Sequence, residues 1–283
     1  MPFSLVPGFA QRYPKEDDDE RHSRLDRASL LIETCCTTLD EALSAQARGA
    51  NRIELCTDLS FGGITPPHDL IREVVQALTI PVNVLIRPLG AGVSIPERLA
   101  ELDPSQRPAL GPSLVHCRGW HGSGMATPAP EGRKGDGGFS YEDFVYDEEE
   151  VQQMIADIEF CKTVGVAGIV VGALTPDGAI DRAAMKRLIT AARPLPVTFH
   201  RAFDVCTADP FLALDQIIAL GCTRLLTSGM AATAWDGRCL ITLLVRRAGS
   251  RLIVMPGRGV TPANLATLAT ATHATEFHGT AIP

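Results

Sequence analysis

Short apolar runs alternate along this chain with longer segments of helical periodicity. The segment 147–164 is the clearest helix, because Val151, Met154, Ile155 and Ile158 recur at core spacing. Six further segments with helical features separate the remaining runs. The strict alternation predicts parallel strands joined by helices, and right-handed crossovers then favour an α/β fold of the TIM (β/α)8 barrel type. The predicted strands are 29–34, 51–56, 81–87, 168–173, 196–200, 223–227, 251–255 and 275–278.

Two segments lack either period. Residues 1–28 are polar and contain the acidic run Glu16–Glu20, which predicts a disordered leader. Residues 93–137 are rich in Pro, Gly, Ser and Ala, which predicts a low-complexity insertion after the third strand of a TIM-barrel domain spanning 29–283. The chain stops soon after the eighth strand, so the final helix of the barrel is expected to be missing.

Composition narrows the function classes. The 283 residues are 45% hydrophobic and can bury one large core. A net charge of -7 argues against a nucleic-acid groove, which needs clustered Lys and Arg. No apolar run approaches the length of a membrane span, and the polar start does not resemble a signal peptide, so a cytoplasmic protein is expected, with a nuclear presence also allowed. The eight scattered cysteines are then expected to be buried thiols or metal ligands.

Polar and reactive side chains stand at the carboxyl ends of the predicted strands. In a barrel these ends converge on one rim, so residues distant in sequence become neighbours. Part of the set is expected to form ion pairs, and a purely structural salt-bridge network is the alternative to a functional site. The set comprises Glu33, Cys35, Glu54, Cys56, Arg87, Gly172, His200, Arg201, Ser228, Gly257, Arg258, Gly259 and His278.

One hypothesis for this rim is an enzyme acting on a small anionic molecule, phosphorylated or carboxylated. Glu33, Glu54 and His200 are its acid–base candidates. The residues expected to hold the anion are Arg87, Arg201, Ser228, Gly257, Gly259 and His278. His200 and the glycines also have a structural interpretation. A histidine at a strand end is often a hydrogen-bonded structural residue, and glycines in a turn can serve only to permit a positive φ.

A second hypothesis concerns the thiols. Side chains alternate along a strand, so Glu33 and Cys35 share a face, as do Glu54 and Cys56, whereas Cys36 points elsewhere. If the first two strands are neighbours, Cys35 and Cys56 occupy matching positions and bring two sulfurs together. Such a soft pair suits Cu(I), whereas the alternative is two small buried apolar residues.

The motifs, taken in order, resemble the CutC copper homeostasis proteins. The matching stretches cover about 30–88 and 139–278, and the most specific is His-Arg-Ala-Phe-Asp at 200–204. Others are Leu-Leu-Ile-Glu-Thr-Cys, Asn-Arg-Ile-Glu-Leu-Cys, Gly-Gly-Ile-Thr-Pro, Gly-Ala-Leu-Thr-Pro-Asp-Gly and Val-Met-Pro-Gly-Arg-Gly-Val. The resemblance implies a TIM barrel, a cytosolic homo-oligomer and a role in copper homeostasis through Cu(I). It also implies Cys35 and Cys56 as copper ligands.

Overall fold

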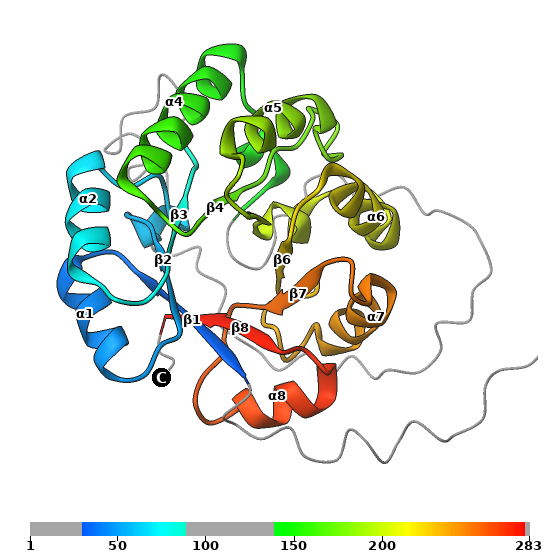
Figure 1. The fold of residues 1–283 in the computed structure, drawn as a ribbon. Coiled ribbons are helices and arrows are strands. Elements are labelled where there is room, and N and C mark those ends of the chain that lie inside the picture. The colour runs from blue at the N-terminus through cyan, green and yellow to red at the C-terminus, as the bar shows by residue number, and fades with distance from the viewer. Residues whose placement is uncertain (1–29, 89–138, 281–283) are drawn as a thin grey trace, which may run out of the picture.

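Eight parallel strands form a ring in the computed structural model, which describes residues 30–88 and 139–280 (Figure 1). Their order around the sheet is β7-β6-β5-β4-β3-β2-β1-β8, and a parallel bridge between Gly257 and His278 joins its two ends. The predicted TIM barrel is therefore confirmed. The strands are β1 (Leu31–Cys36), β2 (Arg52–Leu55), β3 (Val82–Leu85), β4 (Gly168–Val171), β5 (Val197–Phe199), β6 (Arg224–Thr227), β7 (Ile253–Pro256) and β8 (Glu276–Gly279).

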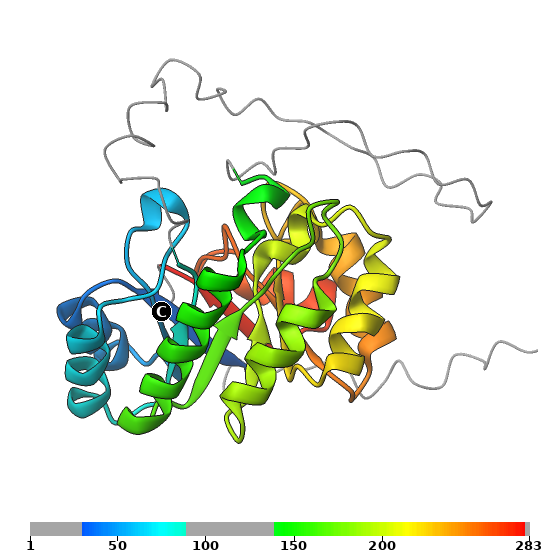
Figure 2. The same cartoon turned by 90° about the horizontal axis from the view of Figure 1, so that it is seen from above.

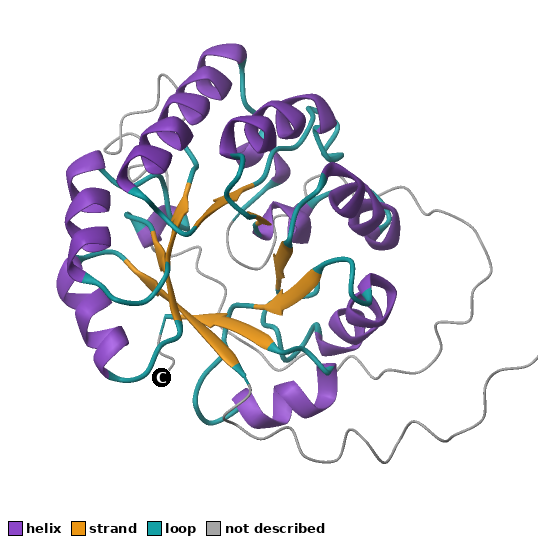
Figure 3. Ribbon diagram, in the orientation of Figure 1, coloured by secondary structure: helices purple, strands orange, loops and turns teal. Residues whose placement is uncertain are grey.

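The α-helices lie around the outside of this ring (Figures 1 and 3). Seen from above, they pack along its sides and leave the strands in the centre (Figure 2). They are α1 (Leu39–Ala47), α2 (His68–Ala77), α4 (Glu148–Val164), α5 (Arg182–Ala192), α6 (Pro210–Leu220), α7 (Arg238–Ala248) and α8 (Leu265–Thr272), with short 3-10 helices η2 (Leu59–Phe61), η4 (Tyr141–Phe144) and η5 (Arg201–Val205). Across the described residues, no helix combines the length and apolarity that crossing a membrane requires.

Local sequence signals explain where several helices begin and end. Asp147 caps α4 in a capping box with Glu150, and Asp209 caps α6 ahead of Pro210. The same two helices end at glycines in the left-handed conformation, Gly165 and Gly221. These signals are short-range, so the boundaries were readable without knowledge of the fold.

The predicted strands are all present, with one shift that affects the site. The first strand runs to Cys36, two residues beyond its predicted end, because its pairing with β2 continues to Cys36 opposite Leu55. The predicted leader at 1–28, the insertion at 93–137 and the end of the chain at 281–283 lie outside the described residues, so these expectations stay predictions.

Side-chain alternation divides the strands into two layers. Outward-facing residues such as Ile53, Val84 and Phe277 are fully buried between the strands and the helices. Cys35, Cys56, Leu85 and Val170 form a separate apolar cluster, as expected if they face the barrel axis. Cys36 belongs to the outer core instead, as strand alternation predicted. The barrel thus separates two adjacent cysteines into different environments.

Candidate metal centre and barrel mouth

A buried network of charges underlies the site. Arg52 on β2 forms ion pairs with Glu33 on β1 and, at 2.7 Å, with Glu276 on β8. Arg224 also contacts Glu276 at 2.7 Å, and Asn83 donates to Glu33 at 3.0 Å. A salt-bridge network was one expectation for these strands, and its hub, Arg52, was not among the predicted site residues. The available signal for Arg52 and Glu276 was a charged residue inside an otherwise apolar strand.

Glu33 is fully buried and remains ionised. Burial by itself raises the pKa of this carboxyl, but hydrogen bonds and charges from His278 and Arg52 outweigh it and lower the pKa from 4.5 to about 2. His278 Nδ1 lies 2.9 Å from Glu33 Oε1. Glu33 thus acts as an anchor for two cationic groups, which makes it a poor proton carrier near neutral pH.

Cys35 and Cys56 lie side by side, with their Sγ atoms 3.4 Å apart. Their backbone register differs from the prediction: Cys35 pairs with Glu54 and not with Cys56. Strands in a barrel are staggered, and this stagger moves β2 by two residues relative to the expected alignment. The side chains nevertheless meet, because positions two apart on a strand share a face. All seven described cysteines are free thiols.

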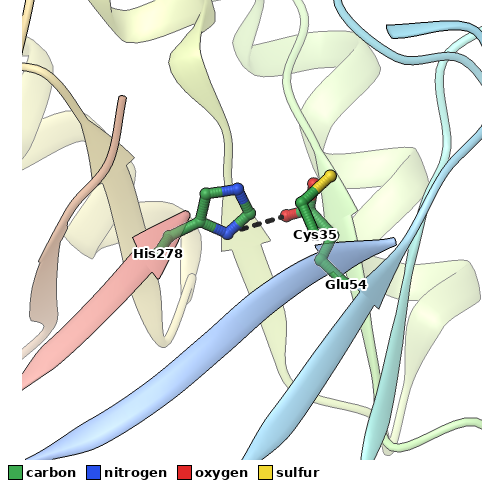
Figure 4. A group of neighbouring side chains, drawn as sticks. All are labelled: Cys35, Glu54 and His278. Atoms are coloured by element: carbon green, nitrogen blue, oxygen red, sulfur yellow. Dashed lines mark ion pairs between the residues drawn. The ribbon is translucent and has the colours of Figure 1, made fainter. Parts of the chain in front are cut away.

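His278 and Glu54 join Cys35 above the ends of β8, β2 and β1 (Figure 4). Donor atoms of the three buried residues all lie within 4.8 Å of one another. His278 Nδ1 is 3.8 Å from Glu54 Oε2, an oxygen that has no hydrogen-bond partner among the described residues. The structure therefore brings together four predicted site residues, Cys35, Cys56, His278 and Glu54, which supply a thiol pair, an imidazole and a carboxylate.

The charges of this group are interdependent. Burial raises the pKa of Glu54 to about 7 and Glu33 adds to the rise, although His278 opposes it. Burial lowers the pKa of His278, but the carboxylates Glu54 and Glu33 and the Cys35 thiol raise it well above its usual value. The hydrogen bond with Cys56, followed by burial, raises the pKa of Cys35. A metal ion entering here must therefore displace protons.

A cleft of about 370 Å³ reaches Cys35 from the side of α1. Its walls come from Thr34 and Cys36 on β1, from the exposed polar face of α1, and from Leu59 and Thr280. Asp40 and Glu41 contribute carboxylates to the wall, and Arg48 contributes a guanidinium. The cleft thus borders Cys35 with a polar wall of mixed charge.

His200 stands in a different part of the rim, directly after β5. Its Nδ1 accepts a hydrogen bond from the Ala202 amide at 3.2 Å, and its ring lies 5.0 Å from that of Phe144, centroid to centroid. Burial, with the positive charges of Arg87 and Arg201, lowers the pKa of His200 to about 3. This imidazole is therefore neutral at physiological pH. Gly172 gives it room, since a Cβ there would lie 2.6 Å from His200 Nδ1.

Arg201 and Ser228 are held together by a residue that the predicted site left out. The Asp204 carboxylate accepts from Arg201 Nε at 2.9 Å, from Ser228 Oγ at 3.0 Å and from the Met230 amide at 3.1 Å. It also accepts from the Thr227 hydroxyl. Asp204 ends the His-Arg-Ala-Phe-Asp motif, so its place in that motif was the available signal. These contacts organise the β5 and β6 loops around one buried carboxylate.

The two glycines of the β7 loop that were expected to bind a phosphate also have structural roles. The Gly257 amide donates to Thr227 O at 2.9 Å, and a Cβ at Gly257 would lie 2.4 Å from a Leu226 methyl. Gly259 has a φ of 70°, which a side chain would strain. The β7 loop thus needs both glycines for backbone reasons, and the proposed contact with an anion stays a prediction.

The fold and this site define a TIM-barrel protein with a polar interior and a thiol pair near its mouth. The model of the CutC family matches residues 30–94 and 140–283. A CutC family protein of Parabacteroides distasonis is 41% identical over 253 residues, covering 89% of this chain and 82% of the relative. The human copper homeostasis protein cutC homolog is 37% identical, covering 88% of this chain and 72% of the relative. The chain belongs to the CutC family.

Solved structures agree with this assignment. A CutC copper homeostasis protein from Streptococcus agalactiae matches with a TM-score of 0.69 at 28% identity, covering 90% of this chain and all of that one. An aldolase, QR15, matches with a TM-score of 0.53 at only 10% identity, which is a likeness of fold alone. The predicted family is confirmed.

Proposed function

We propose that this protein binds Cu(I) through the thiolates of Cys35 and Cys56, with His278 as a third donor, in the service of copper homeostasis. The observation that carries the proposal is the 3.4 Å contact between the two sulfurs beside a buried imidazole. Thiolates are the ligands that Cu(I) prefers, and buried sulfur pairs without a disulfide partner are suited to it. The names of the curated relatives support the same metal.

The spacing of the sulfurs favours a third ligand. With metal–sulfur bonds of about 2.3 Å, sulfurs 3.4 Å apart subtend an angle of about 95° at the metal. A linear two-sulfur site would need them about 4.6 Å apart on the same basis. The present spacing is therefore closer to a three- or four-donor arrangement, and His278 is the neighbour with a nitrogen to offer.

A competitive titration tests this function. Cu(I) is added anaerobically to the protein in the presence of a chromophoric chelator, for the wild type, the double variant Cys35→Ser with Cys56→Ser, and Cys36→Ser. The wild type is expected to take about one equivalent, as one thiol pair allows, and the double variant to lose this binding. Cys36→Ser is the matched control, since its thiol faces the outer core.

Two further measurements sharpen the result. His278→Gln is expected to weaken Cu(I) binding by at least tenfold without abolishing it. A parallel Zn²⁺ titration checks the metal, because sulfur and imidazole also suit zinc. Binding that survives the double variant would refute the thiol site.

The reducing cytoplasm is the compartment we propose, because the site needs both thiols unoxidised.

An enzyme acting on a small anionic metabolite is the second candidate. Glu54 favours it, because a buried carboxyl with a pKa of about 7 is suited to proton transfer at neutral pH. Its Oε2 atom has no hydrogen-bond partner among the described residues. The test is a screen of phosphorylated and carboxylated metabolites for turnover, with Glu54→Gln as the variant that must abolish any activity found.

A further inference from the structure

The histidine after β5 presents a buried donor to the barrel mouth. Its Nδ1 accepts the Ala202 amide, so a neutral His200 carries its proton on Nε2. That Nε2 atom is buried and has no hydrogen-bond partner among the described residues. A buried N–H group left without an acceptor destabilises a fold, so such a group signals a ligand or a bound water.

A second donor of the same kind lies nearby. The Tyr146 hydroxyl is buried and interacts with the Arg87 guanidinium, which has no acceptor to offer, so its own proton has no acceptor in the described parts of the chain. Burial raises the pKa of Tyr146 and lowers that of His200. The positive charge of nearby Arg87 opposes the rise for Tyr146 and adds to the fall for His200. Two neutral donors therefore lie near one cation.

Phe144 and Phe139 form the apolar wall of this group. The Arg87 guanidinium lies 5.1 Å from the Phe144 ring centroid and 5.2 Å from that of Phe139, and the His200 ring packs on Phe144. Arg87 Nη1 also donates to Gly63 O at 2.9 Å, which fixes the side chain. Aromatic packing holds the cation in place, and its charge acts in a poorly solvated environment.

We propose that His200, Tyr146 and Arg87 form a second binding site, distinct from the thiol pair, for the carboxylate group of a small organic acid. A carboxylate supplies acceptor lone pairs for both donors and one negative charge for the guanidinium. The site lies past the carboxyl ends of β3 and β5, the end of a TIM barrel at which ligands bind. A phosphate dianion would bring a second charge, and the other cation near His200, Arg201, already pairs with Asp204 at 2.9 Å.

The test uses the full chain without metal and four probes: acetate, glycolate, succinate and inorganic phosphate. Nitrogen-15 NMR first assigns the imidazole proton of His200, which is expected on Nε2. Each probe is then titrated while the His200 Nε2–H signal is followed. At least one carboxylate is expected to bind saturably and shift this signal, and phosphate is expected to bind more weakly.

Two variants separate binding from folding. Tyr146→Phe removes only the hydroxyl, so it is expected to keep the fold and weaken carboxylate binding about fivefold to tenfold. His200→Phe is expected to weaken it by more than tenfold while leaving Cu(I) uptake unchanged. Conversely, the Cys35→Ser and Cys56→Ser double variant is expected to bind the carboxylate as the wild type does.

Several results would overturn the proposal. They are a proton on Nδ1, no saturable binding of any carboxylate, a preference for phosphate, or affinities that Tyr146→Phe and His200→Phe leave unchanged. Failure of the copper site would show as lost metal binding in the wild type, so the two proposals fail independently.

Discussion

The buried carboxylate of Glu33 allows a quantitative test of how this barrel is stabilised. We consider Glu33→Gln in the metal-free protein, a change that keeps the shape of the side chain and one acceptor oxygen. Glu33 is fully buried and contacts Arg52, His278 and Asn83. The variant removes the negative charge on which two cationic groups depend, and breaking such a buried arrangement is costly.

The magnitude follows from the pKa of the carboxyl. It falls from 4.5 to about 2 on folding, and a tenfold change in an acid constant corresponds to about 1.4 kcal/mol, so the charge contributes about 3 kcal/mol at pH 7. Because the folded-state pKa lies below the unfolded one, this stabilisation is present above pH 4.5 and is lost as the pH falls toward 2. At pH 3 about 1.4 kcal/mol remains.

Urea denaturation followed by circular dichroism measures the effect at pH 7 and at pH 3. The difference in the free energy of unfolding between wild type and Glu33→Gln is expected to be about 3 kcal/mol at pH 7 and less than half of that at pH 3. Glu148→Gln is the matched control. Arg187 lowers the pKa of Glu148 to about 2 as well, but this pair is exposed and screened by solvent.

The control is therefore expected to change stability far less than Glu33→Gln does, although the two carboxyls have the same pKa. Equal effects of the two variants would refute the argument that burial gives the Glu33 charge its weight. A wild-type-minus-variant difference that is the same at pH 7 and pH 3 would refute the linkage to the Glu33 carboxyl.

Two further predictions concern the loops of the mouth. Asp204→Asn replaces a carboxylate that accepts several hydrogen bonds by an amide that also donates. Urea denaturation is expected to show a free energy of unfolding lower by about 3 kcal/mol. A loss below about 1 kcal/mol would contradict this prediction. Gly229→Ala adds a Cβ 2.4 Å from Gly237 O at a φ of 70° and is expected to lower the thermal midpoint strongly. Gly165→Ala, with open space at a φ of 81°, is the control and is expected to cost only about 1 kcal/mol of strain. Equal shifts in the two alanine variants would exclude the clash.

Some of the site could be predicted because strand ends converge in a barrel. Glu33, Cys35, Cys56 and His278 were all selected as residues near the ends of strands, and the structure brings them together. Arg52 was missed because it stands near the start of β2, where no ligand was expected. Its role depends on which residues of β1 and β8 face it across the barrel interior.

The register of β1 and β2 shows the limit of strand patterns. Alternation correctly placed Cys35 and Cys56 on one face, but it aligned the two strands by their glutamates. The observed pairing of Cys35 with Glu54 reflects the stagger that closes the barrel, a property of all eight strands together. One strand pair does not contain that information.

The sequence by itself determined the alternation of strands and helices, the helix boundaries set by residues such as Asp147 and Gly165, and the side of each strand on which a residue lies. These depend on interactions within a few residues of each other. Only the tertiary structure decided that Glu33 is an ionised anchor, that Glu54 titrates near neutral pH and that His200 is neutral. Burial and charges from distant strands set those properties, because electrostatic free energies depend on three-dimensional surroundings.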